Sequence, residues 1–543
     1  MRWLIVLAVL VGGVALAEEP DPHAACGGGP GGPVPAELLE RPVKLRSGIG
    51  HVHEKVTTRS AEAQAFYDQG LAYIHSYVWI EAVRSFHQAL RADPQLAMAE
   101  LGKSRGYSGL EDPPSAQAAL ARAQALAAGA SEWERQRIAL RAIQLDAMAD
   151  RANAEKHQKY KAALDEALAS RPGDAELWIL RGNAEEAQAG GRGQRGKPAS
   201  IAFYEAALAR VPNHLGAHHY LVHTYETNRQ VALALEHGKP FAAQARDVPH
   251  AVHMYAHDLR RVGRVDEAIR LFERARALEL AYYARENVPA KYDWHHLHNL
   301  ALLGTSYQFV GRMADAERTL AQMFAAEPTL ENVDVSRLHY PEFLLLRGRL
   351  DEAAAAATKM ATGGRFAATR AVGHAFAGQV AVVAGRWDDA RRELAAAEKE
   401  AEGEIGIGEL PLPRSSVVAH IDVLRGELLL HDGKTAEGRA LLADVQKRIR
   451  AAPGADAWIA ALYKLEGIAR FALQSGDLEL AAEGARQMLE HDPAYAGTHL
   501  LLARLALGRG DAETARNELK RAKALWRHAD RDLLAEAGGT MPR

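Results

Sequence analysis

The sequence predicts an all-α, right-handed superhelical α-solenoid of about nine or ten stacked helix pairs. Three observations lead to this prediction. Small and bulky apolar residues recur with a period of 34 residues, and no segment keeps the alternation typical of a strand. The composition is 48% hydrophobic but only 6% aromatic, which suits helices rich in Ala and Leu. A repeat chain grows along one axis, so 543 residues need not divide into compact domains.

The clearest repeat begins at residue 63. Counted from there, bulky residues occupy positions 4, 11 and 24, small residues occupy 8, 20 and 27, and a proline occupies 32. The bulky residues are Phe66, Tyr73 and Phe86, the small ones are Gly70, Ala82 and Ala89, and the proline is Pro94. Weaker copies begin at residues 249 and 297. Small residues permit two helices to approach closely, and the proline ends the second helix, so each unit is expected to be a helix pair.

This pattern resembles the tetratricopeptide (TPR) repeat. The resemblance implies a solenoid whose concave groove binds a protein or peptide partner. A smaller, often exported bacterial TPR group is also similar over roughly residues 48 to 330, through its HYLIHAYD-like, PHALHMPSHIF-like and HxLH motifs. Here these are the segments 216–226, 249–257 and 295–298. The chain departs from the group at Leu101-Gly102 and Tyr255-Ala256, and the resemblance implies a fold and a histidine pattern rather than a reaction.

The chain begins like an exported protein. Arg2 precedes an apolar stretch from Leu4 to Ala17 that ends in an A-x-A pattern, which predicts a signal peptide at residues 1–17, cleaved after Ala17. We therefore expect a periplasmic or secreted bacterial protein; the alternative is an uncleaved anchor. Because no later stretch reaches about 18 consecutive apolar residues, no membrane insertion is expected after cleavage.

The rest of the chain divides by composition and repeat signal. We expect a flexible Gly/Pro-rich leader at 18–58 and an N-terminal solenoid at 59–402, with a histidine-rich groove whose core is 214–298. A loop at 403–414, a C-terminal TPR array at 415–532 and a tail at 533–543 follow. The near-balanced charge of −3 argues against a nucleic-acid partner, and the single cysteine excludes an internal disulfide.

Histidines carry the main functional signal. The chain has 24, and eleven lie between His214 and His298. Spacings of three or four residues place two imidazoles on one helix face, where they can share a cation. In repeats that begin at residues 215 and 249, two such pairs fall at positions 5 and 9, which face the groove in TPR proteins. The candidate metal ligands are His219, His223, His253, His257, His295 and His298.

Nearby polar residues complete the candidate site. Groove or supporting roles are assigned to His75, Tyr225, Glu226, His250 and Asp258, and Asp293 is a further carboxylate candidate. Whether His51, His53 and His75 reach the site stays open.

Two functions remain open on these grounds. The first is an exported scaffold that binds a protein or peptide in its groove, where histidines often only hydrogen-bond the partner. The alternative is a histidine-rich protein that binds a divalent metal, copper or zinc, and this alternative includes a metal-dependent enzyme that uses the groove histidines. The sequence leaves enzymatic activity undecided.

Overall fold

The structure of the protein is a computed structural model, which describes residues 34–151, 153–186, 189–194, 196–327, 331–405, 413–452, 455–531 and 533. Within these residues every regular element is a helix, so the predicted all-α solenoid is confirmed. The expected signal peptide lies outside them, as do the beginning of the leader, most of the 403–414 loop and most of the tail. No helix in the described ranges has both the length and the apolar character needed to cross a membrane.

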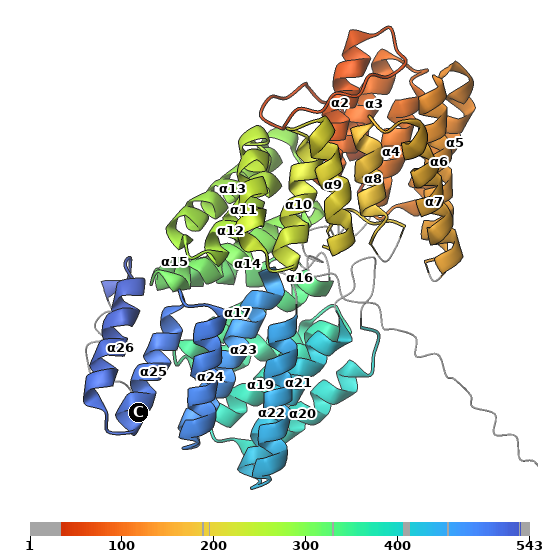
Figure 1. The fold of residues 1–543 in the computed structure, drawn as a ribbon. Coiled ribbons are helices and arrows are strands. Elements are labelled where there is room, and N and C mark those ends of the chain that lie inside the picture. Colours follow the sequence, from red (N-terminus) through yellow and green to blue (C-terminus); the bar gives the residue numbers. More distant parts are fainter. Residues whose placement is uncertain are drawn as a thin grey trace, which may run out of the picture.

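Successive helices form antiparallel pairs along the chain (Figure 1). The first helices of the pairs are α2 (Ala61–Ile74), α4 (Ala97–Gly109), α6 (Glu132–Ala149), α8 (Ala175–Asn183), α10 (Leu215–Thr227), α12 (Pro249–Arg261), α14 (Trp294–Phe309), α17 (His339–Leu346), α19 (Ala367–Val383), α21 (Arg414–His431), α23 (Ala455–Gln474) and α25 (Ala496–Gly508). Their partners are α3 (Trp79–Ala92), α5 (Pro113–Leu126), α7 (Ala154–Ser170), α9 (Pro198–Arg210), α11 (Val231–Gln244), α13 (Val265–Glu286), α15 (Met313–Ala325), α18 (Leu350–Gly363), α20 (Trp387–Ala401), α22 (Thr435–Ala451), α24 (Leu478–His491) and α26 (Ala512–Leu525). Two short helices, α1 (Ala36–Leu39) and α16 (Glu331–Ser336), stand outside this scheme.

The described ranges thus hold twelve helix pairs, more than the sequence count suggested. The reason is variation in helix length. Helix α6 has 18 residues and α13 has 22, compared with 13 or 14 in α2 to α5, so the fixed period is lost around them. Where the period holds, its turns behave as expected: Gly263 and Gly311 end first helices at φ of 78° and 84°, the left-handed region that favours glycine.

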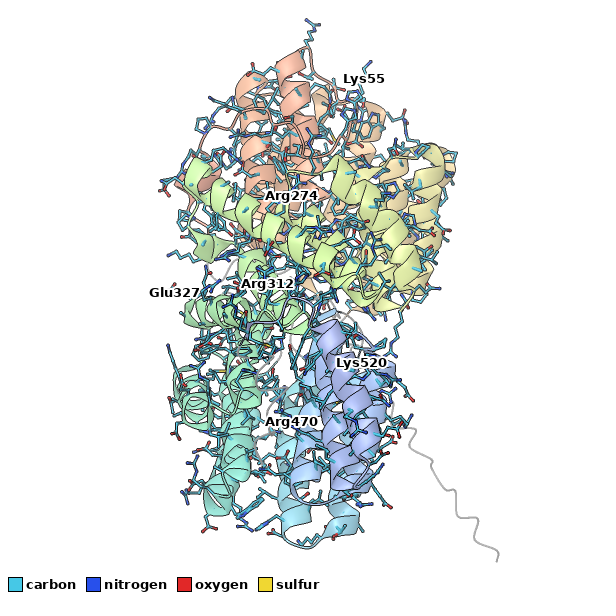
Figure 2. The ribbon with its side chains drawn as sticks, turned by 90° about the vertical axis from the view of Figure 1, so that its left-hand side faces the viewer. Lys55, Arg274, Arg312, Glu327, Arg470 and Lys520 are labelled. Carbon is cyan, nitrogen blue, oxygen red and sulfur yellow. The ribbon has the colours of Figure 1, made fainter. Side chains whose placement is uncertain are left out.

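The pairs are arranged in two lobes (Figure 1). Helices α2 to α15 form one lobe and α17 to α26 form the other, with the last pair returning to lie beside α15. Hydrogen bonds join this return to the turn after α14: the amide of His528 donates to Val310 O (3.0 Å) and the amide of Asp530 donates to Gly311 O (3.1 Å). Figure 2, turned by 90°, shows Arg312 of that turn at mid-height between Lys55 and Arg470. The C-terminal end of the second lobe is therefore joined to the first lobe, and the chain from α14 to α26 forms a closed ring rather than an open superhelix.

Residues 34–58 pack on the first lobe, which the expectation of a flexible leader did not foresee. Four apolar side chains of this segment are buried. In addition, Arg41 Nη1 donates to Glu286 O (2.6 Å), and the amide of Asp247 donates to Gly48 O (2.9 Å). Burial and long-range hydrogen bonds make the segment a strap across the lobe. The four buried residues are Leu38, Leu39, Ile49 and Val56.

Candidate metal centre

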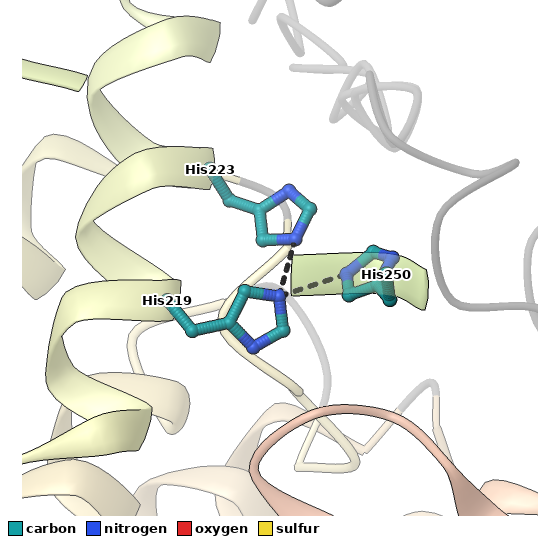
Figure 3. A group of neighbouring side chains, drawn as sticks. All are labelled: His219, His223 and His250. Carbon is teal, nitrogen blue, oxygen red and sulfur yellow. Dashed lines mark hydrogen bonds between the residues drawn. The ribbon is translucent and has the colours of Figure 1, made fainter. Parts of the chain in front are cut away.

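Three imidazoles meet where α10 faces the start of α12 (Figure 3). His219 and His223 lie one turn apart on α10, and His250 lies in the first turn of α12. The Nε2 atom of His219 is 3.0 Å from Nε2 of His223 and 2.9 Å from Nε2 of His250. All three side chains are buried, with at most 4% of any residue exposed. We call this set the first trio.

A second trio repeats this arrangement one repeat later. His253 and His257 lie one turn apart on α12, and His298 lies on α14. One ring nitrogen from each lies within 4.8 Å of the other two. The Nε2 atoms of His253 and His257 are 2.7 Å apart, and the ring centroid of His298 is 4.8 Å from that of His253. Both trios therefore take positions 5 and 9 of one repeat and position 2 of the next.

The nitrogen spacing suits a metal ion. Zinc bound to imidazole has Zn–N distances of 2.0–2.1 Å, which places neighbouring ligand atoms of a tetrahedral site about 3.3 Å apart. The contacts of 2.9 and 3.0 Å in the first trio need to lengthen only slightly to reach that separation. Three ligands also leave one coordination position open, as in catalytic zinc sites.

Hydrogen bonds on the opposite ring edge orient two of these imidazoles. His219 Nδ1 donates to the carbonyl oxygen of His75 (2.6 Å). His253 Nδ1 donates to Asn299 Oδ1 (2.7 Å), because Asn299 Nδ2 is itself a donor to Phe272 O (3.2 Å). A ring that donates through Nδ1 keeps a lone pair on Nε2, the atom that faces its own trio. Sequence reasoning missed Asn299, which carries no histidine-like signal.

The electrostatics of the trios also favour neutral ligands. Burial lowers the pKa of His250 and His253 well below the usual value, and the neighbouring imidazoles lower these pKa values further. Both rings are therefore uncharged near neutral pH, the form that binds metals.

The structure divides the candidate ligands named from the sequence between two neighbouring sets. His250, assigned only a groove or supporting role, completes the first trio, and the six ligands form two sets. His295 belongs to neither: its ring lies between them, with centroids 5.2 Å from His250 and 4.5 Å from His253. Its Nδ1 is 2.6 Å from Glu279 Oε1. The two sets are neighbours, since the rings of His250 and His253 are 6.4 Å apart.

Of three supporting residues expected from the sequence, Glu226 lies beside a trio, whereas Asp258 and Tyr225 make other contacts. Glu226 lies near the second trio, with its Oε1 atom 3.6 Å from His257 Nδ1 and 3.7 Å from Arg261. Asp258 turns away: a Cβ atom added at Gly238 of α11 would lie 2.7 Å from its Oδ2 atom. Burial and the charge of Glu226 raise the pKa of Asp258, against the opposing effect of Arg261. Tyr225 donates to Glu205 instead (2.9 Å).

The remaining candidates lie elsewhere or act indirectly. Asp293 caps α14, since its Oδ1 accepts from the amide of His295 (3.0 Å). His51 is exposed, and His53 Nδ1 contacts Asp68 Oδ2 at the surface (2.7 Å), so neither joins the trios. His75 contributes its carbonyl oxygen to the first trio.

The ring of His75 belongs to a third cluster, with Glu176 and His214. This cluster differs in charge from the trios. Guanidinium groups of Arg105 and Arg137 lie 3.5 and 3.7 Å from Glu176 Oε2. Two fixed positive charges already neutralise the carboxylate and would repel a cation. We therefore interpret this cluster as a buried ion-pair network that supports the first trio.

Aromatic rings cover the first trio where an open groove was expected. The ring centroid of Tyr77 is 4.4 Å from that of His219 and 5.3 Å from that of His250. Tyr77 lies in the turn between α2 and α3 at φ 57°, a region that bulky residues rarely adopt. Trp294 contacts His250 at 6.1 Å from the start of α14. The backbone thus accepts strain at a residue that shields the imidazoles.

The chain is similar to several solved structures, all at low sequence identity. No protein-family model and no curated protein matches the chain. The pilus biogenesis factor PilW is 19% identical, covering 48% of this chain and 92% of PilW, with a TM-score of 0.25. The APC/C hetero-tetramer Cut9-Hcn1 is 12% identical, covering 88% of this chain and 84% of that one, with a TM-score of 0.34.

The human IFIT1 dimer with m7Gppp-AAAA is 12% identical, covering 88% of this chain and 92% of that one, with a TM-score of 0.34. These likenesses concern the fold alone. The described helix pairs form an α-solenoid, in agreement with the tetratricopeptide-repeat pattern of the sequence. The two histidine trios are a feature added to that solenoid.

Proposed function

We propose that this protein is an exported TPR solenoid that binds two transition-metal ions, copper or zinc, one in each histidine trio. The observation that carries the proposal is the convergence of ring nitrogens in the first trio, where two Nε2 atoms lie 2.9 and 3.0 Å from a third. The second trio strengthens it, because the same three repeat positions converge again one repeat later.

The ligand chemistry favours a transition metal over magnesium or calcium, and among the transition metals we choose copper and zinc. Imidazole nitrogens suit zinc, copper, nickel and iron, whereas magnesium and calcium prefer oxygen ligands. Each trio consists of imidazoles alone. The export expected from the N-terminal sequence fits this choice, because copper and zinc are more accessible outside the cytoplasm. An open fourth position at each ion would also permit metal-dependent chemistry.

The test is metal content, measured on mature protein purified without a histidine tag and reconstituted with copper(II) or zinc(II). We expect about two ions per chain. His219→Ala should abolish one, His257→Ala the other, and the double variant both, because each trio loses a ligand.

His218→Ala is the matched control. This residue also lies on α10, but its Nδ1 contacts His237 (3.0 Å) and it belongs to neither trio. The control should keep both ions. A reconstituted protein without bound metal, or equal losses in the control, would contradict the proposal.

A scaffold function would use a different surface. A cavity of about 480 Å³ lies between the ends of α10 and α12 and helices α22 to α24. Its lining includes four basic residues and one acidic residue, Glu490, which favours an acidic peptide. Binding of a fluorescent oligoglutamate that is lost in Lys447→Ser would support this second candidate; binding unchanged in that variant would oppose it. The basic residues are Arg229, Arg261, Lys447 and Arg450.

A further inference from the structure

The extended part of the strap lies on the first lobe as a bound peptide would. Residues 42–60, all of which the structure describes, form no helix or strand. Among them only Ile49 and Val56 are buried. Because so few apolar side chains are covered, the segment depends on polar contacts with helices α2, α3 and α6 to stay in place.

A glutamine of α2 binds the backbone of this segment at its C-terminal end. Gln64 Nε2 donates to Glu54 O (2.9 Å), and Gln64 Oε1 accepts from the amide of Val56 (3.0 Å). The side-chain amide thus joins the C=O of one residue to the N–H of the residue two further on. A neighbouring strand in a parallel sheet makes the same pair of bonds. Such contacts recognise an extended backbone whatever side chains it carries.

A second glutamine of α2 repeats this arrangement further along the strap. Gln69 Nε2 donates to Lys44 O (3.2 Å), and its Oε1 accepts from the amide of Arg46 (2.7 Å). On α3, Arg84 Nη2 donates to Pro42 O (3.0 Å). Side chains of two helices therefore satisfy backbone groups that a strand would otherwise satisfy.

One side chain of the strap is bound by charge as well. The carboxylate of Glu54 accepts from the hydroxyl of Tyr67 on α2 (2.5 Å) and from Arg137 Nη2 on α6 (3.3 Å). Tyr67 and Arg137 are only 3% and 4% exposed. A buried guanidinium group favours a carboxylate at this position over any neutral side chain.

The residues that follow complete a short recognition sequence. Val56 is buried, whereas Lys55 points to solvent. The amide of Thr57 donates to Glu134 Oε1 on α6 (2.7 Å), and its hydroxyl donates to the same carboxylate. The surface formed by α2 and α6 therefore fits the sequence Glu-x-Val-Thr in extended conformation.

This surface lies on the same face of the repeats as the metal-ligand trios. Gln64 and Tyr67 occupy positions 2 and 5 of the repeat that begins at residue 63. In the later repeats these two positions carry trio histidines. The face that brings imidazoles together in the middle of the lobe thus binds a peptide segment at its beginning.

We propose that the surface of α2 and α6 is a binding site for an extended Glu-x-Val-Thr segment of a partner protein, which the strap of this chain occupies until the partner replaces it. Both segments would use the same backbone contacts and the same carboxylate pocket. The proposal goes beyond the metal sites and does not depend on them, so it can be tested on metal-free protein.

The test measures binding of a fluorescent peptide with the sequence of residues 43–57 to the full mature chain, by fluorescence anisotropy. A tethered strap has an effective concentration of the order of millimolar, so the free peptide should bind the unchanged protein weakly. Glu54→Ala in the protein removes the charged contact of its own strap. The peptide should bind this variant at least about tenfold more tightly.

Two altered peptides test the recognition sequence on that same variant, with no further change to the protein. A peptide that carries Glu54→Ala should bind at least about tenfold more weakly than the original peptide. A peptide that keeps Glu-Lys-Val-Thr and replaces the other residues by glycine and serine should still bind more tightly than the alanine peptide.

A matched pair of glutamine variants, each added to Glu54→Ala, tests the location. Gln64→Met removes the backbone contacts of α2 and should weaken peptide binding at least about tenfold, whereas Gln117→Met, at an exposed position on α5, should not affect it. If the peptide does not bind Glu54→Ala, binds it no more tightly than the unchanged protein, or binds equally with and without Gln64, the strap is a permanent part of the fold and the proposal is overturned.

Discussion

At the scale of single residues, the trios are defined by where each imidazole keeps its proton. In the first trio, His219 donates through Nδ1 to a backbone carbonyl, so its Nε2 can only accept from His223 and His250. A metal ion must displace the protons that now lie between these nitrogens. Binding should therefore release protons and weaken as the pH falls.

A buried glutamate in the second lobe gives a residue-scale prediction. Burial raises the pKa of Glu427 on α21 from 4.5 to about 8, although a hydrogen bond from Gln379 opposes the rise. Between these values the folded state keeps a proton that the unfolded state releases, so stability falls as the pH rises from about 4.5 to 8. Glu427→Gln mimics the protonated form. Its stability advantage should grow across that window to roughly 2–4 kcal/mol.

Chemical denaturation at several pH values checks this expectation. Glu437→Gln, at an exposed position on the adjacent helix α22, is the control and should change stability little at any pH. An advantage for Glu427→Gln that does not vary with pH would show that the residue is charged in the folded protein.

The sequence could predict four of the six trio histidines as facing pairs, because positions 5 and 9 of a regular repeat have fixed directions. It also named His298 but could not assign it to a trio. His250 was harder, since a residue in the first turn of a helix reaches its neighbours only through the angle between successive repeats. The cover over the first trio was likewise hidden, because it includes Tyr77, whose backbone adopts a conformation that its residue type disfavours.

At the scale of helices, the glycine at position 8 explains how close the pairs lie. The ring of Phe86 on α3 is fully buried between Gly70 of α2 and Gly102 of α4. A Cβ atom added at Gly70 would lie 2.6 Å from this ring, and one at Gly102 would lie 2.5 Å from it. An aromatic ring cannot yield as a flexible chain end can, so the three helices are locked at their present separation.

The corresponding prediction compares two glycine-to-alanine changes. Gly70→Ala should destabilise the protein by about 1–3 kcal/mol, because overpacking outweighs the better helix propensity of alanine. Gly467→Ala is the matched case on α23, where an added Cβ atom would meet nothing within 4 Å. It should stabilise by about 0.5–1 kcal/mol. Thermal denaturation of both variants tests this; the same sign for both would contradict the packing account.

At the scale of the whole molecule, the end of the second lobe closes onto the first lobe. Its last helix pair and the residues after it return to the turn that follows α14, and the tilted rings of Phe309 and Tyr495 have centroids 5.0 Å apart. Such closure has no signature in a repeat sequence, because it arises from small rotations summed over many pairs. Closure removes one free end of the solenoid and links the stability of the C-terminal array to that of α14, the helix that carries His298.

Trp526 lies at the contact between the returning chain and α14, and its removal tests whether this contact holds the closure together. Its side chain is 7% exposed, and its Nε1 donates to Gln308 O (3.2 Å). Trp526→Ala should weaken closure by about 3–5 kcal/mol, the usual effect of removing a buried tryptophan. Exchange of the His528 and Ala314 amides, whose acceptors Val310 O and Asp530 Oδ2 lie across the closure, should then become faster by at least an order of magnitude.

Hydrogen exchange measured by residue distinguishes loss of closure from general destabilisation. Trp387→Ala is the control, because this tryptophan stacks on His431 within the ring, with ring centroids 3.5 Å apart, and takes no part in closure. It should leave the His528 and Ala314 amides protected. Metal binding by the trios should survive Trp526→Ala, since their six histidines lie on α10, α12 and α14 within the first lobe. If the two amides exchange no faster in Trp526→Ala than in the control, the return of the chain to α14 is not what holds the second lobe together.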